Sequence, residues 1–201
     1  MSKIINIGRS FGSGGGFIGQ AVAHKLGIPF YDNELISQAA EENGYSKALF
    51  ADGEKKRSIF STSSFFSSGR MSYLDGAFVN EDILFKAQAE VIRAIADKGD
   101  AVIIGRCADY ILRDRPCLNV FVCAPEAYRI QRLVEREGLT PQEAEKLMRR
   151  KDRTRESYYN YYTFGAWGQA DNYNLCVDSS VLGIEGTADF IIEFGRRAGL
   201  I

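Results

Sequence analysis

The chain has 201 residues and a formal net charge of −1, with 45% hydrophobic and 25% charged residues, a composition typical of globular proteins. This length predicts one domain over residues 1–201 with embedded insertions. The near-neutral charge excludes a general positive field, so we expect neither nucleic acid nor a membrane surface as a partner. No apolar run approaches the ~20 residues of a membrane span, and the N-terminus lacks the apolar core of a signal peptide, so we expect a cytoplasmic protein.

The first predicted strand, Lys3–Gly8, leads through a glycine-rich loop into a predicted helix over Phe17–Leu26. Glycine lets a backbone turn with positive φ, and a run of glycines can bring several N–H groups to one centre. Together with the positive end of the helix, these donors favour a phosphate site over a plain glycine-rich turn. The predicted phosphate-binding loop consists of Gly12, Ser13, Gly14, Gly15 and Gly16.

The same segment also matches the G-x-G-x-x-G dinucleotide fingerprint at Gly14, Gly16 and Gly19, with Asp32 ending the next strand. That fingerprint needs its first glycine at the end of the strand, whereas Gly14 lies six positions beyond Gly8. The loop length therefore favours a P-loop, and an NAD-dependent oxidoreductase is the less favoured alternative.

Strand and helix patterns alternate along the rest of the chain, which predicts a doubly wound parallel sheet with right-handed crossovers. The runs VIIG and VFVC are apolar on both faces, as in strands of a covered parallel sheet. The further predicted strands are Ile28–Tyr31, Ala101–Gly105, Leu118–Cys123 and Asn174–Asp178. The further predicted helices are Asn33–Glu42, a helix capped by Asn80 and ending at Lys98, a helix opened by the capping box Thr140–Glu143 and running through Arg155 towards Tyr162, and Ile184–Ala198.

Residues 12–27, GSGGGFIGQAVAHKLG, resemble the GSGKGT-plus-helix opening of cytidylate kinases, and more closely that of the divergent cytidylate kinase-like branch. The resemblance continues in IPFYDNELI (28–36), VIIGRCADYILRDRP (102–116) and DRTRESYYNYYTFGAWGQADNYNLCVDSS (152–180). It implies a three-layer P-loop kinase fold with a five-stranded parallel sheet in the order 2-3-1-4-5. It also implies an NMP-binding insertion at 44–79, a lid-like region at 138–170, and ATP and Mg²⁺ as cofactors.

Three side chains of the family's loop are missing from this chain. The position of the phosphate-binding lysine is Gly15, that of the Ser or Thr that holds magnesium is Phe17, and that of the arginine common in divergent relatives is Gly16. Phosphoryl transfer depends on neutralising the charge of the γ-phosphate, so these losses put turnover in doubt. Arg9 is a candidate replacement cation, and the alternative is a solvated loop arginine.

The resemblance also supplies candidate residues outside the loop. Arg106 follows the third strand, where cytidylate kinases contact the monophosphate, and its alternative is a structural salt bridge. Asp152 and Arg155 match the lid's D-x-x-R pattern, so we expect Asp152 to orient Arg155 towards a phosphate. The candidate catalytic residues are Arg106, Arg132 and Arg155, and the candidate acceptor-binding residues are Asp32, Arg106, Asp109, Arg149, Asp152 and Arg155, with no metal ligand among them.

The sequence therefore predicts ATP-dependent phosphoryl transfer to a nucleoside monophosphate. The competing hypothesis is a nucleotide-binding protein with little or no kinase turnover. The aromatic residues between Tyr158 and Tyr173 are interpreted as core beneath the lid or as a subunit contact, which leaves a homodimer open.

Overall fold

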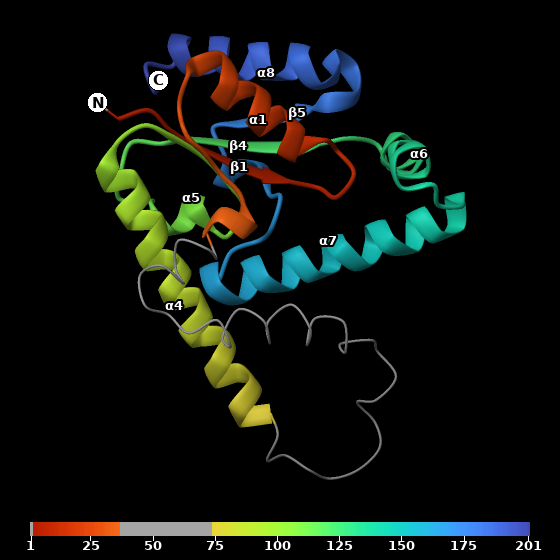
Figure 1. Ribbon diagram of the computed structural model, residues 1–201, viewed down its shortest axis with the longest axis horizontal. Coiled ribbons are helices and arrows are strands. Elements are labelled where there is room, and N and C mark those ends of the chain that lie inside the picture. The colour runs from red at the N-terminus through yellow and green to blue at the C-terminus, as the bar shows by residue number, and fades with distance from the viewer. Residues whose placement is uncertain (1, 37–73) are drawn as a thin grey trace.

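The computed structural model describes residues 2–36 and 74–201, with side chains from residue 81 in the second range. Five parallel strands form one sheet in the order β2-β3-β1-β4-β5, which confirms the predicted order (Figure 1). β1 lies at the centre of the sheet, where Ile5 is paired with Val102 on one side and with Leu118 on the other. The strands are β1 Ile4–Arg9, β2 Phe30–Tyr31, β3 Ala101–Ile104, β4 Leu118–Cys123 and β5 Leu175–Asp178.

Helices cover both faces of the sheet, with α1 and α8 on one face and α4 and α5 on the other (Figure 1). Alternate residues of β1 point to opposite faces. Ile5 and Ile7 pack with Ile18 of α1 and Ile191 of α8, whereas Ile4 packs against α4 and α5. The helices are α1 Gly15–Leu26, α4 Leu74–Lys98, α5 Ala108–Ile111, α6 Glu126–Glu137, α7 Pro141–Thr163 and α8 Ser179–Arg197, with a 3₁₀ turn at Ala170–Asn172.

The predicted capping box at the start of α7 is confirmed. Thr140 accepts a hydrogen bond from the Glu143 amide at 3.3 Å, and the Glu143 carboxylate accepts one from the Thr140 amide at 2.9 Å. α7 packs against α6 through a small cluster of Leu133, Ala144 and Met148, and its far end reaches the α4–α5 side of the sheet through Tyr159. The lid-like region therefore consists largely of one long helix that begins beside α6 and ends beneath the sheet (Figure 1).

Several predicted boundaries are wrong. α4 begins at Leu74, so Asn80 lies inside the helix and is not its cap. The predicted start at Ile184 agrees with the regular helix that follows the non-helical Gly183 within α8. The part of α8 before this kink, which begins at Ser179 and is capped by the Asp178 side chain accepting from the Ser180 amide, was not predicted. Residues 33–36 of the predicted second helix are helical, and its remainder lies outside the described residues. Of the predicted 44–79 insertion, residues 44–73 lie outside the described residues and 74–79 belong to α4.

Candidate phosphate-binding site

The glycine-rich loop joins the end of β1 to the start of α1, as predicted. Gly12 and Gly14 have φ values of 84° and 83°, which L side chains rarely adopt, so the loop needs glycine at both positions. Gly14 caps α1 without any side-chain hydrogen bond, and no described group accepts from the amides of Gly14, Gly15 or Gly16. The first amides of a helix have no intrahelical acceptor, so these donors are left for an anion.

Ser13 anchors the loop to the sheet. Its buried hydroxyl donates to the Ser10 carbonyl at 2.9 Å. The Ser179 hydroxyl, at the start of α8, lies 2.6 Å from the Ser13 carbonyl and 3.1 Å from the Cys123 carbonyl, both of which can accept from it. Sequence reasoning missed Ser179, and its only signal was its place directly after the fifth strand.

Asp152 of α7 anchors the loop from the other side. Its carboxylate accepts from the Phe11 amide at 2.6 Å and from the Arg129 guanidinium at 2.5 Å. Arg129 is 8% exposed and also donates to the Phe11 carbonyl at 3.2 Å. We expected Asp152 to orient Arg155, but its carboxylate holds Arg129 and the loop backbone.

Arg155 instead contacts the end of β1. Its guanidinium donates to the Arg9 carbonyl at 3.0 Å and lies 5.3 Å from the centre of the Phe11 ring. Desolvation lowers the pKa of Arg155 to about 10. The charge of Asp152 opposes this shift, and the charges of Arg106 and Arg129 add to it. Arg155 therefore remains charged at neutral pH, and it lies in a strongly cationic environment.

Arg106 lies on a strained turn directly after β3. Gly105, Arg106 and Cys107 have φ values of 72°, 56° and 54°, and the latter two are not glycine. Left-handed backbone at a non-glycine residue costs about 1–2 kcal/mol, and such strain gathers at functional sites. The Arg106 guanidinium lies 5.4 Å from the centre of the Tyr158 ring, on α7. The structure thus brings Arg106 and Arg155 to the same edge of the sheet.

The two other acidic candidates already have protein partners. Asp32 caps the helix that begins at 33, accepting from the amides of Glu34 and Leu35 at 3.0 and 3.1 Å. Asp109 accepts from the Tyr159 hydroxyl at 2.8 Å, and burial raises the pKa of Asp109. Burial and this carboxylate together raise the pKa of Tyr159.

The remaining arginine candidates differ in position. A Cβ built at Gly14 would lie 3.3 Å from Nη2 of Arg132, so Arg132 lies beside the loop. Arg149 is exposed and forms ion pairs with Glu126 and Glu145, so the structure does not bring it to Arg106 or Arg155.

The loop itself offers no metal ligand at the expected position. Phe17 carries a phenyl ring that is 45% exposed in place of a hydroxyl. The described residues contain no group of three or more His, Cys, Asp or Glu side chains that could hold a metal ion. These residues do not fit a protein-held Mg²⁺ at the loop.

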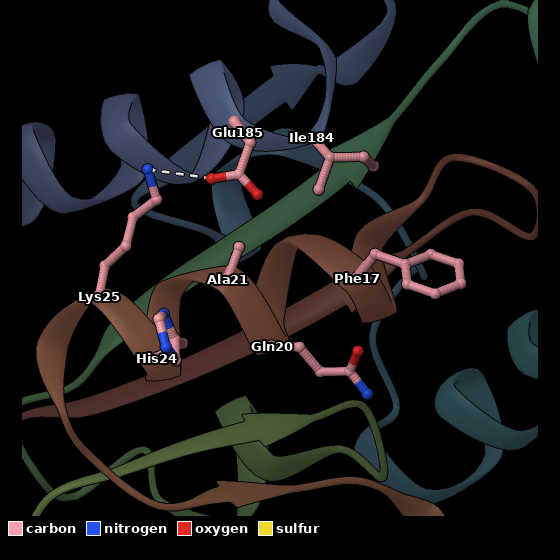
Figure 2. Close-up of a pocket in the computed structure, with 7 residues that line it drawn as sticks. All are labelled: Phe17, Gln20, Ala21, His24, Lys25, Ile184 and Glu185. Carbon is pink, nitrogen blue, oxygen red and sulfur yellow. Dashed lines mark ion pairs between the residues drawn. The ribbon is translucent and has the colours of Figure 1, made fainter.

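A pocket of about 350 Å³ lies between α1 and α8, on the outer side of α1 (Figure 2). Lys25 closes one end through ion pairs with Glu185 at 3.0 Å and Asp189 at 2.7 Å. None of the candidate site residues lines this pocket. The pocket is therefore separate from Arg106, Arg132 and Arg155. No helix in the described part of the chain is long and apolar enough to cross a membrane.

The sequence pattern of the cytidylate kinase-like family matches residues 4–181. The chain belongs to the cytidylate kinase-like family. A cytidylate kinase of Aeropyrum pernix is 31% identical over 107 residues, which cover 53% of this chain and 62% of that protein. The chain therefore matches about three fifths of the length of that relative.

Two solved structures are similar in fold to this chain. An uncharacterized protein from Eubacterium ventriosum is 27% identical with a TM-score of 0.72, over 96% of this chain and 97% of that one. A shikimate kinase from Acinetobacter baumannii, solved with shikimate, is 14% identical with a TM-score of 0.56, over 100% of this chain and 96% of that one. The second likeness concerns the fold alone, and it agrees with the observed strand order.

Proposed function

We propose that this chain catalyses ATP-dependent phosphoryl transfer to a nucleoside monophosphate, with CMP as the first acceptor to test. The observation that carries the proposal is the gathering of Arg9, Arg106 and Arg155 beside the uncapped start of α1. Several cations near a helix N-terminus suit a ligand that carries several phosphate charges. Family membership supports a nucleotide as that ligand.

In the proposed reaction, an anionic oxygen of the monophosphate attacks the γ-phosphorus of ATP. The bond between that phosphorus and the β–γ bridging oxygen breaks, which yields ADP and a nucleoside diphosphate. Because the attacking oxygen is already an anion, no general base is needed. Catalysis then depends on positioning and on neutralising charge.

Each group has a distinct part in this proposal. The free amides of Gly14–Gly16 and the adjacent Arg132 bind the phosphates of ATP. Arg106, held on its strained turn after β3, binds the phosphate of the acceptor. Arg155 stabilises the transferring group between them. Mg²⁺ enters as part of the ATP substrate, since the residues at the loop supply it no ligand.

A second candidate function is nucleotide binding without turnover. Gly15 and Phe17 favour it, because they replace the lysine and the hydroxyl of active P-loop kinases. The two functions differ in one product, since only transfer forms ADP in an acceptor-dependent way.

The deciding experiment measures ADP formation from ATP in the presence of CMP, UMP, AMP or GMP, together with the thermal shift caused by each nucleotide. Acceptor-dependent ADP formation supports the kinase, and it should be lost in Arg106→Ala but kept in Arg115→Ala. Arg115 is a matched control because it lies on the surface, paired with Asp97 at 2.6 Å. A thermal shift with ATP, without ADP formation for any acceptor of the panel, would support nucleotide binding without turnover and contradict the kinase.

A further inference from the structure

Arg9 fills the space that a side chain at the lysine position of the loop would need. A Cβ built at Gly15 would lie 2.6 Å from Cβ and 3.0 Å from Cγ of Arg9. Heavy atoms do not approach this closely without displacement, so a lysine at position 15 and Arg9 in its present place are mutually exclusive. The chain has an arginine on β1 beneath the loop, whereas the GSGKGT opening of cytidylate kinases, which this loop resembles, has a lysine at the position of Gly15.

The other end of the Arg9 side chain is accommodated by a second glycine. A Cβ built at Gly105, just after β3, would collide with Nη1 of Arg9. The side chain therefore crosses from the end of β1 to the end of β3, between the loop and the turn that carries Arg106. Two glycines on different elements leave room for one arginine.

The Arg9 guanidinium has no ion pair with any described residue. Desolvation and the nearby charges of Arg155 and Arg106 lower the pKa of Arg9 to about 9, and only Asp32 opposes this shift. The group therefore remains a cation at neutral pH. A poorly solvated cation beside two further cations is unfavourable unless an anion binds.

We propose that Arg9 is the cation that binds the phosphate chain of the donor nucleotide in place of the missing P-loop lysine. This inference rests on the proposed function, because it needs ATP as the donor. It adds a residue that reaches the phosphates from β1, whereas the family's lysine reaches them from α1. It also explains how Gly15 can lack a side chain while the site keeps its charge.

The main test compares Arg9→Met with the wild-type protein by calorimetric titration. Methionine keeps the aliphatic stem beneath Gly15 and removes the charge. A charge-assisted hydrogen bond corresponds to roughly 10- to 100-fold in affinity, so ATP should bind that much more weakly, while CMP affinity should change less than about threefold. Arg115→Met, which removes a surface arginine, should leave both affinities unchanged. Unchanged ATP affinity in Arg9→Met, or an equal loss for CMP, would overturn the inference.

A second measurement separates ligand binding from a structural role. Without nucleotide, Arg9→Met should melt at the same or a higher temperature, because it removes a cation that forms no ion pair with the described residues. A melting temperature several degrees lower would mean that Arg9 serves the fold, and would overturn the inference.

A residue exchange tests the replacement directly. Arg9→Gly removes the Cβ that blocks position 15, so Arg9→Gly/Gly15→Lys offers a cation from α1 instead. Arg9→Gly/Gly15→Lys should bind ATP at least about tenfold more tightly than Arg9→Gly alone, since an equivalent charge returns to the loop. No recovery would count against the replacement.

The outcomes also separate this inference from the proposed function. If the wild-type protein binds ATP but transfers no phosphate, the proposed function fails, and the ATP affinity of Arg9→Met still decides the role of Arg9. If the wild-type protein transfers phosphate and Arg9→Met binds ATP normally, only the inference fails. A wild-type protein that binds no ATP overturns both.

Discussion

Asp152→Asn should destabilise the protein strongly, because Asp152 of α7 forms a largely buried ion pair with Arg129 of α6 and also accepts from the Phe11 amide of the phosphate loop. The Arg129 and Asp152 side chains are 9% and 19% exposed, and the pair is the main anionic contact of Arg129. Removing one partner of a buried pair costs about 3–5 kcal/mol, and the partial exposure of Asp152 favours the lower value. Nε of Arg129 already lacks a hydrogen-bond acceptor, so the variant would leave this guanidinium poorly satisfied. In a chain of this length, 3 kcal/mol corresponds to a fall in melting temperature of roughly 6–12 °C.

The assay is scanning calorimetry combined with urea unfolding. Glu145→Gln is the control, because it breaks an exposed ion pair with Arg149 and should cost less than about 0.5 kcal/mol. The double variant Arg129→Met/Asp152→Leu should recover only part of the loss, since an apolar pair leaves no unpaired charge but removes the partners of the Phe11 amide and carbonyl. A loss below about 1 kcal/mol in Asp152→Asn would refute the view that this pair, with its bonds to the Phe11 backbone, holds α6, α7 and the loop together.

Three further predictions concern single side chains. Arg106→Ala should weaken CMP binding about 10- to 100-fold while ATP affinity stays within about threefold, measured by titration calorimetry, and an equal loss of both would contradict its assignment to the acceptor. Gly16→Arg should fold normally and bind ATP about tenfold more tightly, because a Cβ there meets nothing within 4 Å and the change adds a cation to the first turn of α1; weaker ATP binding would contradict this. Burial raises the pKa of Asp109 above 3.8, so the native protein keeps a proton that the unfolded chain releases, and its stability falls as pH rises through that window. Asp109→Asn removes this loss, so its advantage in melting temperature over the wild type should be larger near pH 7 than near pH 4, and an equal difference at both would argue against a raised pKa.

The parts of the fold that depend on local chemistry could be predicted from the sequence. The run LNVFVC gives β4 its observed bounds, and the Thr140–Glu143 capping box marks the start of α7. The short helical part of α8 before the kink at Gly183 could not be predicted, because Asp178 caps it from within the strand motif. Strand order came from the family resemblance, since strand patterns alone do not specify which strands pair.

The candidate site was less predictable than the fold. The glycine loop and Arg106 were found because their residue types identify them. The left-handed turn at Arg106 and Cys107 could not be predicted, because non-glycine residues rarely take positive φ and nothing in the sequence marks the exception. The contact of Asp152 with Phe11 joins residues 141 positions apart, so helical spacing could not reveal it. For the same reason the sequence left open whether Arg9 is a solvated loop arginine or a replacement cation, and its neighbours in the structure support the proposal that it is a replacement cation.

The phosphate loop is held by bonds to groups outside its glycine string. Asp152 fixes the Phe11 amide, Ser179 fixes the Ser13 carbonyl and Arg155 fixes the Arg9 carbonyl. All three bonds are made between groups of the protein itself, so the loop should need little further ordering on binding, and association should be governed by diffusion and electrostatic steering. The same arrangement frees positions 16 and 17 from any duty in shaping the backbone, which gives a lineage room to exchange side chains there while the curvature of the loop persists.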